Sequence, residues 1–189
     1  MQILGRGASG PTNLQAIGLD QTLINLRQAI HQARCESGIG QQCVAAACLA
    51  MAGVDRAQEE LLLTEWASCH KIAKRIQVTN DSVGLLTAGT PEGWGIALIA
   101  GTGSIAFGQT VDGRVARTGG WGYLLGDEGS AYALALAGLR AAVRSADGRD
   151  PTNQLLPAFL TRLELDHADD LLEAIYLSGR DRAWIALLA

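Results

Sequence analysis

Residues 94–104 read Trp94-Gly95-Ile96-Ala97-Leu98-Ile99-Ala100-Gly101-Thr102-Gly103-Ser104. The run as far as Ala100 is apolar and does not alternate with polar residues, which is typical of a buried strand in an α/β sheet. It continues directly into Gly101, Thr102 and Gly103, where the backbone can turn with its amides converging on an anion while the Thr hydroxyl adds a neutral donor. We interpret this loop as a phosphate cradle without a lysine. Taken in isolation, these four residues would favour a tight turn that enters a hairpin, and it is their context that favours a phosphate site.

A second glycine-rich stretch reads Gly119-Gly120-Trp121-Gly122-Tyr123-Leu124-Leu125-Gly126-Asp127-Glu128-Gly129-Ser130. Aromatic rings can cover the apolar faces of a pyranose, and the carboxylates of Asp127 and Glu128 can accept hydrogen bonds from vicinal hydroxyls. This mixture favours a sugar site. The alternative is that the two carboxylates only stabilise the positive end of the following helix, but that role does not account for Gly-Gly-Trp-Gly.

Strands and helices alternate on either side of these loops. Apolar runs and turn residues predict strands at 43–50, 75–78 and 94–100 and a hairpin of 105–110 with 114–118 across Val111-Asp112-Gly113. Helical spacing predicts helices after Asn13 to Gly38, over 57–70, briefly from 82, and over 128–146, 153–163, 168–177 and from about 181. The pattern indicates an α/β fold, in which ligands bind beyond the carboxyl ends of strands.

Asp81 and Asn13 are the candidate polar residues of the first half. Asp81 follows a predicted strand, which we expect in the same sheet as the strand before Gly101, and its carboxylate could accept a proton from an attacking hydroxyl. Asn13 ends a glycine-rich loop and could present its amide to a ligand. Either residue could instead cap the helix that follows it, and the two roles can coexist.

Composition limits the classes of function. The chain has 189 residues, is 48% hydrophobic and carries a net charge of −4 without a basic run, so we expect a globular protein that binds small solutes rather than nucleic acid or membrane. The first residues lack the apolar core of a signal peptide, which favours the cytoplasm. The four cysteines form no Cys-x-x-Cys pair and are expected to be reduced and buried, and the scattered histidines predict no structural metal.

Two familiar nucleotide motifs do not apply. Gly5-x-Gly7-x-x-Gly10 matches the dinucleotide fingerprint, but Pro11 follows it directly and the strand–turn–helix context is missing, so we interpret it as a glycine-rich loop. The sequence has no Gly-x-x-x-x-Gly-Lys-Ser/Thr, which excludes a P-loop.

Together, Asn80-Asp81, the Gly101–Ser104 loop and the 119–130 stretch resemble the BadF/BadG/BcrA/BcrD ATPase family, and within it the N-acetylglucosamine and glucosamine kinases. The resemblance runs from Gly5 to about Tyr176. It implies an actin-like ATPase (ribonuclease H-like) fold, with part of the N-terminal domain in residues 1–99 and part of the C-terminal domain in 100–189. It also implies ATP and Mg²⁺ as cofactors and a homodimer as a possible assembly.

The resemblance further implies roles for individual residues. Asp81 is similar to the family's catalytic base at the sugar 6-hydroxyl, and Gly101, Thr102 and Gly103 are similar to its ATP phosphate loop. The positions that resemble sugar contacts are Asn13, Ser104, Gly120, Trp121, Gly122 and Asp127.

The sequence departs from the family pattern at two places. An Asp-Gly-Gly-Gly-Thr-type phosphate loop does not precede Gly5, and a further glycine-rich segment against the adenosine is not reached. We therefore expect either a piece truncated at both ends or a degenerate protein, with weak or no turnover by this chain. The predicted activity of the intact protein is phosphorylation of an amino sugar at its 6-hydroxyl. The alternatives are a non-catalytic sugar-binding module and, less favoured by the cysteine positions, an ATPase that activates a dehydratase or reductase.

Overall fold

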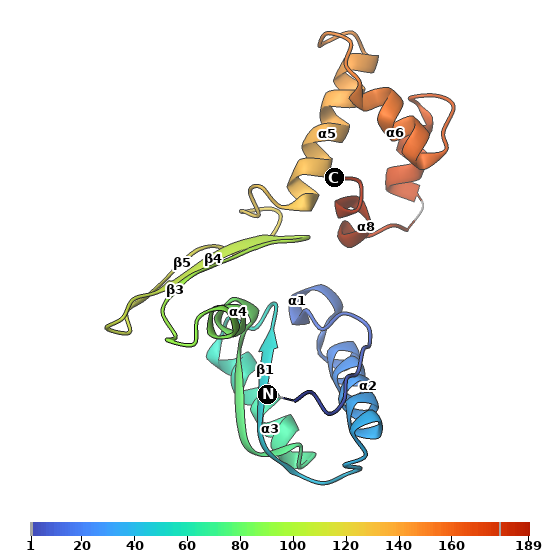
Figure 1. Cartoon of the computed structure of the whole chain (residues 1–189). Helices are drawn as coiled ribbons and strands as arrows, with labels where there is room; N and C mark the ends of the chain where they lie inside the picture. Colours follow the sequence, from blue (N-terminus) through green and yellow to red (C-terminus); the bar gives the residue numbers. More distant parts are fainter. Residues whose placement is uncertain (1, 178) are drawn as a thin grey trace. The chain divides into compact units, whose positions relative to one another are not determined.

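The structure is a computed structural model that describes residues 2–177 and 179–189 (Figure 1). The chain forms two compact units, Met1–Gly93 and Trp94–Ala189. The expected division, after residue 99, assigns most of the strand Gly95–Ala100 to the first unit. The division after Gly93 assigns the whole strand to the second unit. The predicted α/β composition is confirmed: strands and helices alternate in the first unit, and in the second unit three strands are followed by helices.

The first unit is a two-stranded parallel sheet with helices. Its elements are α1 (Leu14–Ile17), α2 (Leu19–Ser37), β1 (Val44–Met51), α3 (Ala57–Cys69), β2 (Ala73–Asn80) and α4 (Asp81–Gly89). The strands are in register from Val44 opposite Ala73 to Met51 opposite Asn80, so both carboxyl ends lie at one edge. Apolar residues of β1, α3 and β2 form the core, and Leu23, Leu26 and Ile30 pack on it from α2, which is the amphipathic face predicted from their spacing.

The glycine motif of residues 5–10 packs directly against α2. A Cβ atom at Gly7 would lie 1.9 Å from the carbonyl oxygen of Ala29, and one at Gly5 would lie 2.3 Å from that of Ala33. Side chains of α2 bind the segment at regular helical spacing: Gln32 Oε1 accepts from the amide of Ala8 at 2.9 Å, and Asn25 Nδ2 donates to the carbonyl of Pro11 at 2.6 Å. Glu36 accepts from the amide of Arg6, and Gln28 Oε1 accepts from the hydroxyl of Ser9 at 3.0 Å. The motif therefore serves close packing on a helix, in agreement with the rejection of a dinucleotide site.

The second unit begins with an antiparallel sheet, which Figure 1 shows as a long curved ribbon. Its strands are β3 (Gly95–Ala100), β4 (Ser104–Gln109) and β5 (Val115–Gly119), in the order β3-β4-β5. The predicted hairpin across 111–113 is confirmed. The expectation that Asp81 follows a strand of the sheet that contains the Gly101 loop is wrong, because β2 pairs with β1 and β3 pairs with β4. β3 is also not buried on both faces, since Ile96 and Leu98 are 82% and 67% exposed.

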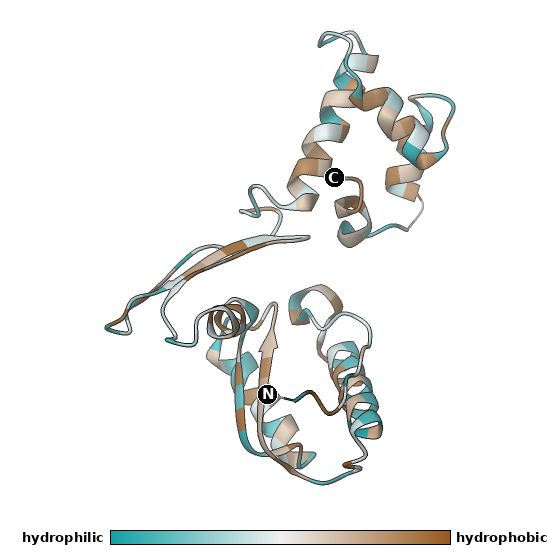
Figure 2. Cartoon of the chain, in the orientation of Figure 1, coloured by the Kyte–Doolittle hydropathy of each residue, from teal (hydrophilic) through white to brown (hydrophobic). Residues whose placement is uncertain are grey.

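Helices complete the second unit: α5 (Ala131–Ala146), α6 (Leu155–Leu163), α7 (Asp170–Leu172), the π-helical η1 (Glu173–Leu177) and α8 (Arg182–Ala186). Leu139 and Ala142 of α5 pack with Phe159 of α6 and with Leu171 to form its core. Figure 2 shows the apolar residues of α5 and α6 as brown bands.

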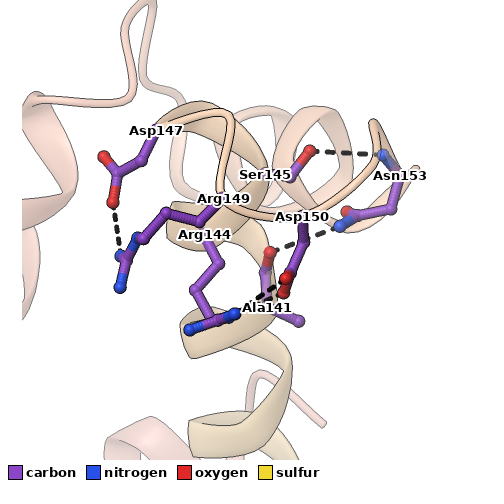
Figure 3. A network of polar contacts seen from close by, with 7 residues as sticks. All are labelled: Ala141, Arg144, Ser145, Asp147, Arg149, Asp150 and Asn153. Carbon is purple, nitrogen blue, oxygen red and sulfur yellow. Dashed lines mark hydrogen bonds and ion pairs between the residues drawn. The ribbon is translucent and has the colours of Figure 1, made fainter.

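Polar contacts hold the turn from α5 to α6 (Figure 3). Arg144 donates to both carboxylate oxygens of Asp150, at 2.6 and 2.8 Å, and Asn153 Nδ2 donates to the carbonyl of Ala141 at 3.2 Å. These contacts explain why the helix predicted from its Ala- and Leu-rich sequence stops at Asp147 and the chain reverses.

The expected burial of the cysteines is wrong. Cys35, Cys43, Cys48 and Cys69 are free and exposed. The run around Cys48 suggested a strand covered on both faces, but a two-stranded sheet leaves much of β1 uncovered, and Cys35 and Cys69 lie on the outer sides of helices. Among the described residues, no helix combines the length and the apolarity needed to cross a bilayer.

Candidate active site

In the first unit, Asp81 and Asn13 both lie at the edge where β1 and β2 end. Asp81 follows Asn80, which pairs with Met51, and Gly53 comes two residues after Met51. A Cβ at Gly53 would lie 2.5 Å from Oδ1 of Asn13, so Asn13 contacts the turn after β1. The parallel register therefore brings the two predicted residues to one sheet edge, as expected for ligand-binding positions in α/β units.

Asp81 is the first residue of α4, and the N-cap is Asn80. Asn80 Oδ1 accepts from the amide and the hydroxyl of Ser82 at 2.9 and 2.6 Å, while its Nδ2 donates to Asp55 Oδ1 at 3.0 Å. The residue that caps α4 is therefore Asn80 and not Asp81. Burial raises the pKa of the Asp81 carboxyl above its ordinary value of 3.8; amide hydrogen bonds oppose the shift, and the nearby carboxylate of Asp55 adds to it.

Asn13 does cap a helix. Its Oδ1 accepts from the amides of Gln15 and Ala16 at 3.1 and 3.3 Å, at the start of α1. Within the part of the chain that the structure describes, its Nδ2 makes no hydrogen bond, so the side chain retains two donor hydrogens beside Gly53.

In the second unit, the Gly101–Ser104 loop is the tight turn of the β3–β4 hairpin, with Ala100 opposite Ser104. The amide of Gly101 donates to the carbonyl of Gly103 at 2.9 Å, and that of Ser104 donates to Asp127 Oδ1 at 3.0 Å. The amides of Thr102 and Gly103 form no hydrogen bond with any described residue. The backbone therefore forms the hairpin turn of the alternative interpretation, and the adjacent amides of Thr102 and Gly103 remain available to donate to a ligand.

The amino end of α5 meets the same turn. The amide of Ala131, the first residue of α5, donates to the carbonyl oxygen of Gly101 at 2.9 Å, and the buried N-cap Ser130 accepts from the amide of Ala133 at 3.1 Å. Because a helix carries partial positive charge at this end, the 16 residues of α5 favour an anion near the turn.

Asp127 joins the turn to the 119–130 stretch. Its side chain lies against Gly103, where a Cβ would be 2.9 Å from each carboxylate oxygen, so glycine is required there for space. Asp127 is 4% exposed and has φ 64°, a left-handed conformation that aspartate tolerates better than most residues. Arg182 Nη1 of α8 lies 3.8 Å from its Oδ2. The carboxylate thus contacts two segments that are far apart in sequence, the 101–104 turn and α8.

The remaining predicted positions surround this cluster. Gly120 has φ 71° and donates its amide to the carbonyl of Ser104 at 2.9 Å, while the Ser104 hydroxyl donates to the carbonyl of Glu128 at 2.8 Å. Trp121 is 65% exposed, with the Arg117 guanidinium 5.5 Å from its ring centroid. The carbonyl of Gly122 accepts from the amide of Gly126 at 2.8 Å, which closes the loop.

Sequence reasoning missed Asp55 and Arg182. Asp55 follows β1 at the same edge as Asp81, so the rule that selected Asp81 could have selected it too. Nothing local pointed to Arg182, since its contact with Asp127 joins segments that are far apart in sequence.

Comparisons with known proteins give the context of these clusters. The chain is 33% identical over 179 residues to an N-acetylmuramic acid/N-acetylglucosamine kinase of Clostridium acetobutylicum, and the match covers 95% of this chain and 58% of the relative. It is 34% identical over 144 residues to an N-acetyl-D-glucosamine kinase of Dictyostelium discoideum, covering 75% of this chain and 44% of the relative. The chain thus spans about half the length of these curated relatives.

Solved structures agree. A crystal structure of a protein of Chromobacterium violaceum proposed to be an N-acetylglucosamine kinase matches with a TM-score of 0.79 and 25% identity, over 98% of this chain and 63% of that one. A Porphyromonas gingivalis protein of the same proposed kind matches with a TM-score of 0.69 and 26% identity, over 97% of this chain and 62% of that one. The predicted actin-like ATPase fold is confirmed by these matches. Because the family model covers residues 1–188, the chain belongs to the BadF/BadG/BcrA/BcrD ATPase family.

Proposed function

We propose that this protein transfers the γ-phosphoryl group of ATP to the 6-hydroxyl of an amino sugar, N-acetylglucosamine or glucosamine. The observation that carries the proposal is the pair of amides of Thr102 and Gly103, which bond to none of the described residues and lie in a turn bonded to the amino end of α5. The names of the relatives supply the substrate class. In the family's terms, residues 1–99 would belong to the N-terminal domain and 100–189 to the C-terminal domain, and we place the reaction in the cytoplasm.

The turn would bind phosphate oxygens. The two amides and the Thr102 hydroxyl are neutral donors, and the positive end of α5 adds favourable potential. Because the turn contains no lysine, charge neutralisation would fall to Mg²⁺, which in kinases typically binds substrate phosphates together with one or two carboxylates.

Asp81 would accept the proton of the sugar hydroxyl. A carboxylate whose pKa is raised by burial holds a proton more strongly than an exposed one, which favours its use as a general base. The Asn80 amide, bonded on one side to Asp55 and on the other to Ser82, fixes the start of α4 and with it the position of Asp81.

The sugar would be recognised by polar and aromatic groups. Asn13 offers two amide hydrogens, and the exposed ring of Trp121 offers an apolar face for a pyranose. The proposed set is completed by Gly120, Gly122, Ser104 and Asp127. Each carboxylate oxygen of Asp127 has two lone pairs, so its contacts with Ser104 and Arg182 leave acceptor positions for sugar hydroxyls.

The test combines calorimetry with sugar-dependent ADP release. In the intact protein, Asp81→Asn is expected to lower turnover by at least about 100-fold, the usual contribution of a general base, without loss of sugar binding. The exposed Asp20 of α2 provides the control, because Asp20→Asn removes the same charge from the same unit. Undiminished turnover by Asp81→Asn would refute the assignment of the base. Sugar binding without any ADP release would support the non-catalytic module instead, and the absence of both would end the proposal.

A further inference from the structure

A pocket of about 340 Å³ lies in the first unit between α2 and α3. Its residues include Ile72, immediately before β2, and Gln41, shortly before β1, so it lies at the amino edge of the sheet. Asn13, Gly53 and Asp81 lie at the carboxyl edge. The pocket is therefore separate from the proposed catalytic residues of this unit.

Two arginines make the lining cationic. Arg27 and Arg34 come from α2, His31 of α2 and His70 at the end of α3 also line the pocket, and the lining contains no acidic side chain. Among residues 2–177 and 179–189, neither Arg27 nor Arg34 forms an ion pair with a carboxylate. The whole chain carries a net charge of −4, so this concentration of positive charge is local.

Neutral groups hold both arginines in place. Arg34 donates to the carbonyls of Ile72 and Gln42 at 3.1 and 3.3 Å. Arg27 Nη2 lies 2.6 Å from Nε2 of His70, whose Nδ1 lies 2.7 Å from the carbonyl of Trp66. If Nδ1 donates to that carbonyl, Nε2 is the acceptor for Arg27. The guanidinium groups are thus positioned without being neutralised, and each keeps further N–H donors.

One wall of the pocket is apolar. Ile30 and the half-buried Trp66 contribute to the lining, and the Trp66 ring lies over His70 with centroids 4.9 Å apart. An aromatic and aliphatic surface beside two guanidinium groups suits a ligand with an anionic end and a less polar body.

We propose that this pocket binds the phosphate group of a small phosphate monoester, with Arg27 and Arg34 as its charged donors. Arginine matches the geometry of phosphate oxygens, and the absence of carboxylates from the lining removes the competition for the guanidinium groups. A sugar phosphate and a mononucleotide share this chemistry. The proposal does not depend on the kinase activity.

The experiment is an NMR titration of the ¹⁵N-labelled chain with inorganic phosphate, glucosamine 6-phosphate and AMP, with glucosamine as the control that lacks a phosphate group. Saturable shifts are expected for the Trp66 indole and the backbone around His31 and His70 with each phosphate compound, and not with glucosamine. The tighter of the two esters identifies the source of the phosphate.

Variants decide whether the pocket is responsible. Arg27→Ala is expected to weaken phosphate binding by about tenfold or more, as for the loss of a charged hydrogen-bond donor, and Arg27→Lys to restore part of it. Arg75→Ala, which removes an equal charge from an exposed position of β2 outside the pocket, should leave binding unchanged. Absence of saturable shifts around Trp66 would overturn the proposal, as would shifts confined to Gly101–Ser104 or equal binding by Arg27→Ala and Arg75→Ala.

Discussion

Substitutions of Asp127 should separate the contribution of its carboxylate as a hydrogen-bond acceptor from that of its left-handed backbone conformation. The carboxylate accepts from the amide of Ser104, and the residue holds a left-handed φ of 64°. Asp127→Asn keeps an acceptor oxygen and a side chain that tolerates this conformation. Asp127→Gly removes the acceptor but relieves the backbone, and Asp127→Ala removes the acceptor while keeping the unfavourable φ.

The expected destabilisation is smallest for Asp127→Asn, larger for Asp127→Gly and largest for Asp127→Ala. Loss of a charged hydrogen bond at a buried site costs about 1.5–3 kcal/mol, and a non-glycine residue in the left-handed region costs about 1–2 kcal/mol more. We therefore expect a loss of about 2.5–5 kcal/mol for Asp127→Ala, about 1–2 kcal/mol less for Asp127→Gly, and about 1 kcal/mol for Asp127→Asn.

Hydrogen exchange at the Ser104 amide is the direct measurement, because that amide loses its acceptor in the Ala and Gly variants. Urea unfolding followed by tryptophan fluorescence in a Trp66→Phe background reports the stability of the same unit, because the other three tryptophans belong to it. Equal destabilisation by Asn and Ala, or unchanged exchange at Ser104, would refute the reasoning.

Three further predictions follow from the close contacts and from one pKa. Gly103→Ala should displace Asp127 and accelerate exchange at Ser104, whereas Gly101→Ala in the same turn, where a Cβ meets no atom within 4 Å, should not. Gly7→Ala should free the amide of Ala8 for exchange and lower the free energy of unfolding by about 1–3 kcal/mol, because the new Cβ would clash with the backbone of α2. The control is Gly89→Ala, whose Cβ would meet no atom within 4 Å. Equal effects of the two substitutions would contradict the packing argument. The raised pKa of Asp81 means that the folded state binds the proton more tightly than the unfolded chain, so the charged carboxylate lowers the free energy of unfolding above the folded-state pKa. At pH 7 the urea midpoint of Asp81→Asn should therefore be higher than that of the unsubstituted protein. This difference should disappear as the pH falls to 3.8, the ordinary pKa of an aspartate.

Helices and strands were predictable where one local pattern dominated. The spacing of Leu23, Leu26 and Ile30 predicted the buried face of α2, and Val111-Asp112-Gly113 predicted a hairpin. The pairing of strands was not predictable in the same way. Apolar runs such as 94–100 suit a parallel strand buried on both faces, and nothing within the run announces that β3 instead pairs antiparallel with β4.

The candidate site was predictable in its residue types but not in its contacts. Gly103 was selected for backbone freedom, yet its φ is not left-handed and its contact with Asp127 is what requires glycine. The Asp127–Arg182 contact depends on how α8 folds back within its unit, which no local pattern encodes. The roles of the site residues in catalysis stay predictions.

The packing of residues 5–11 on α2 also determines where this protein can accept sequence change. The segment is held by its own backbone and by the Ser9 hydroxyl, so the side chains of Arg6 and Ala8 contribute little to the contact and should vary freely among related sequences. The restriction falls instead on Gly5 and Gly7 and on the polar face of α2, at Asn25, Gln28, Gln32 and Glu36. A saturation mutagenesis library should therefore show alternating intolerant and permissive positions in the segment, matched by a polar stripe on α2 that resists replacement by apolar residues although much of it is exposed to solvent.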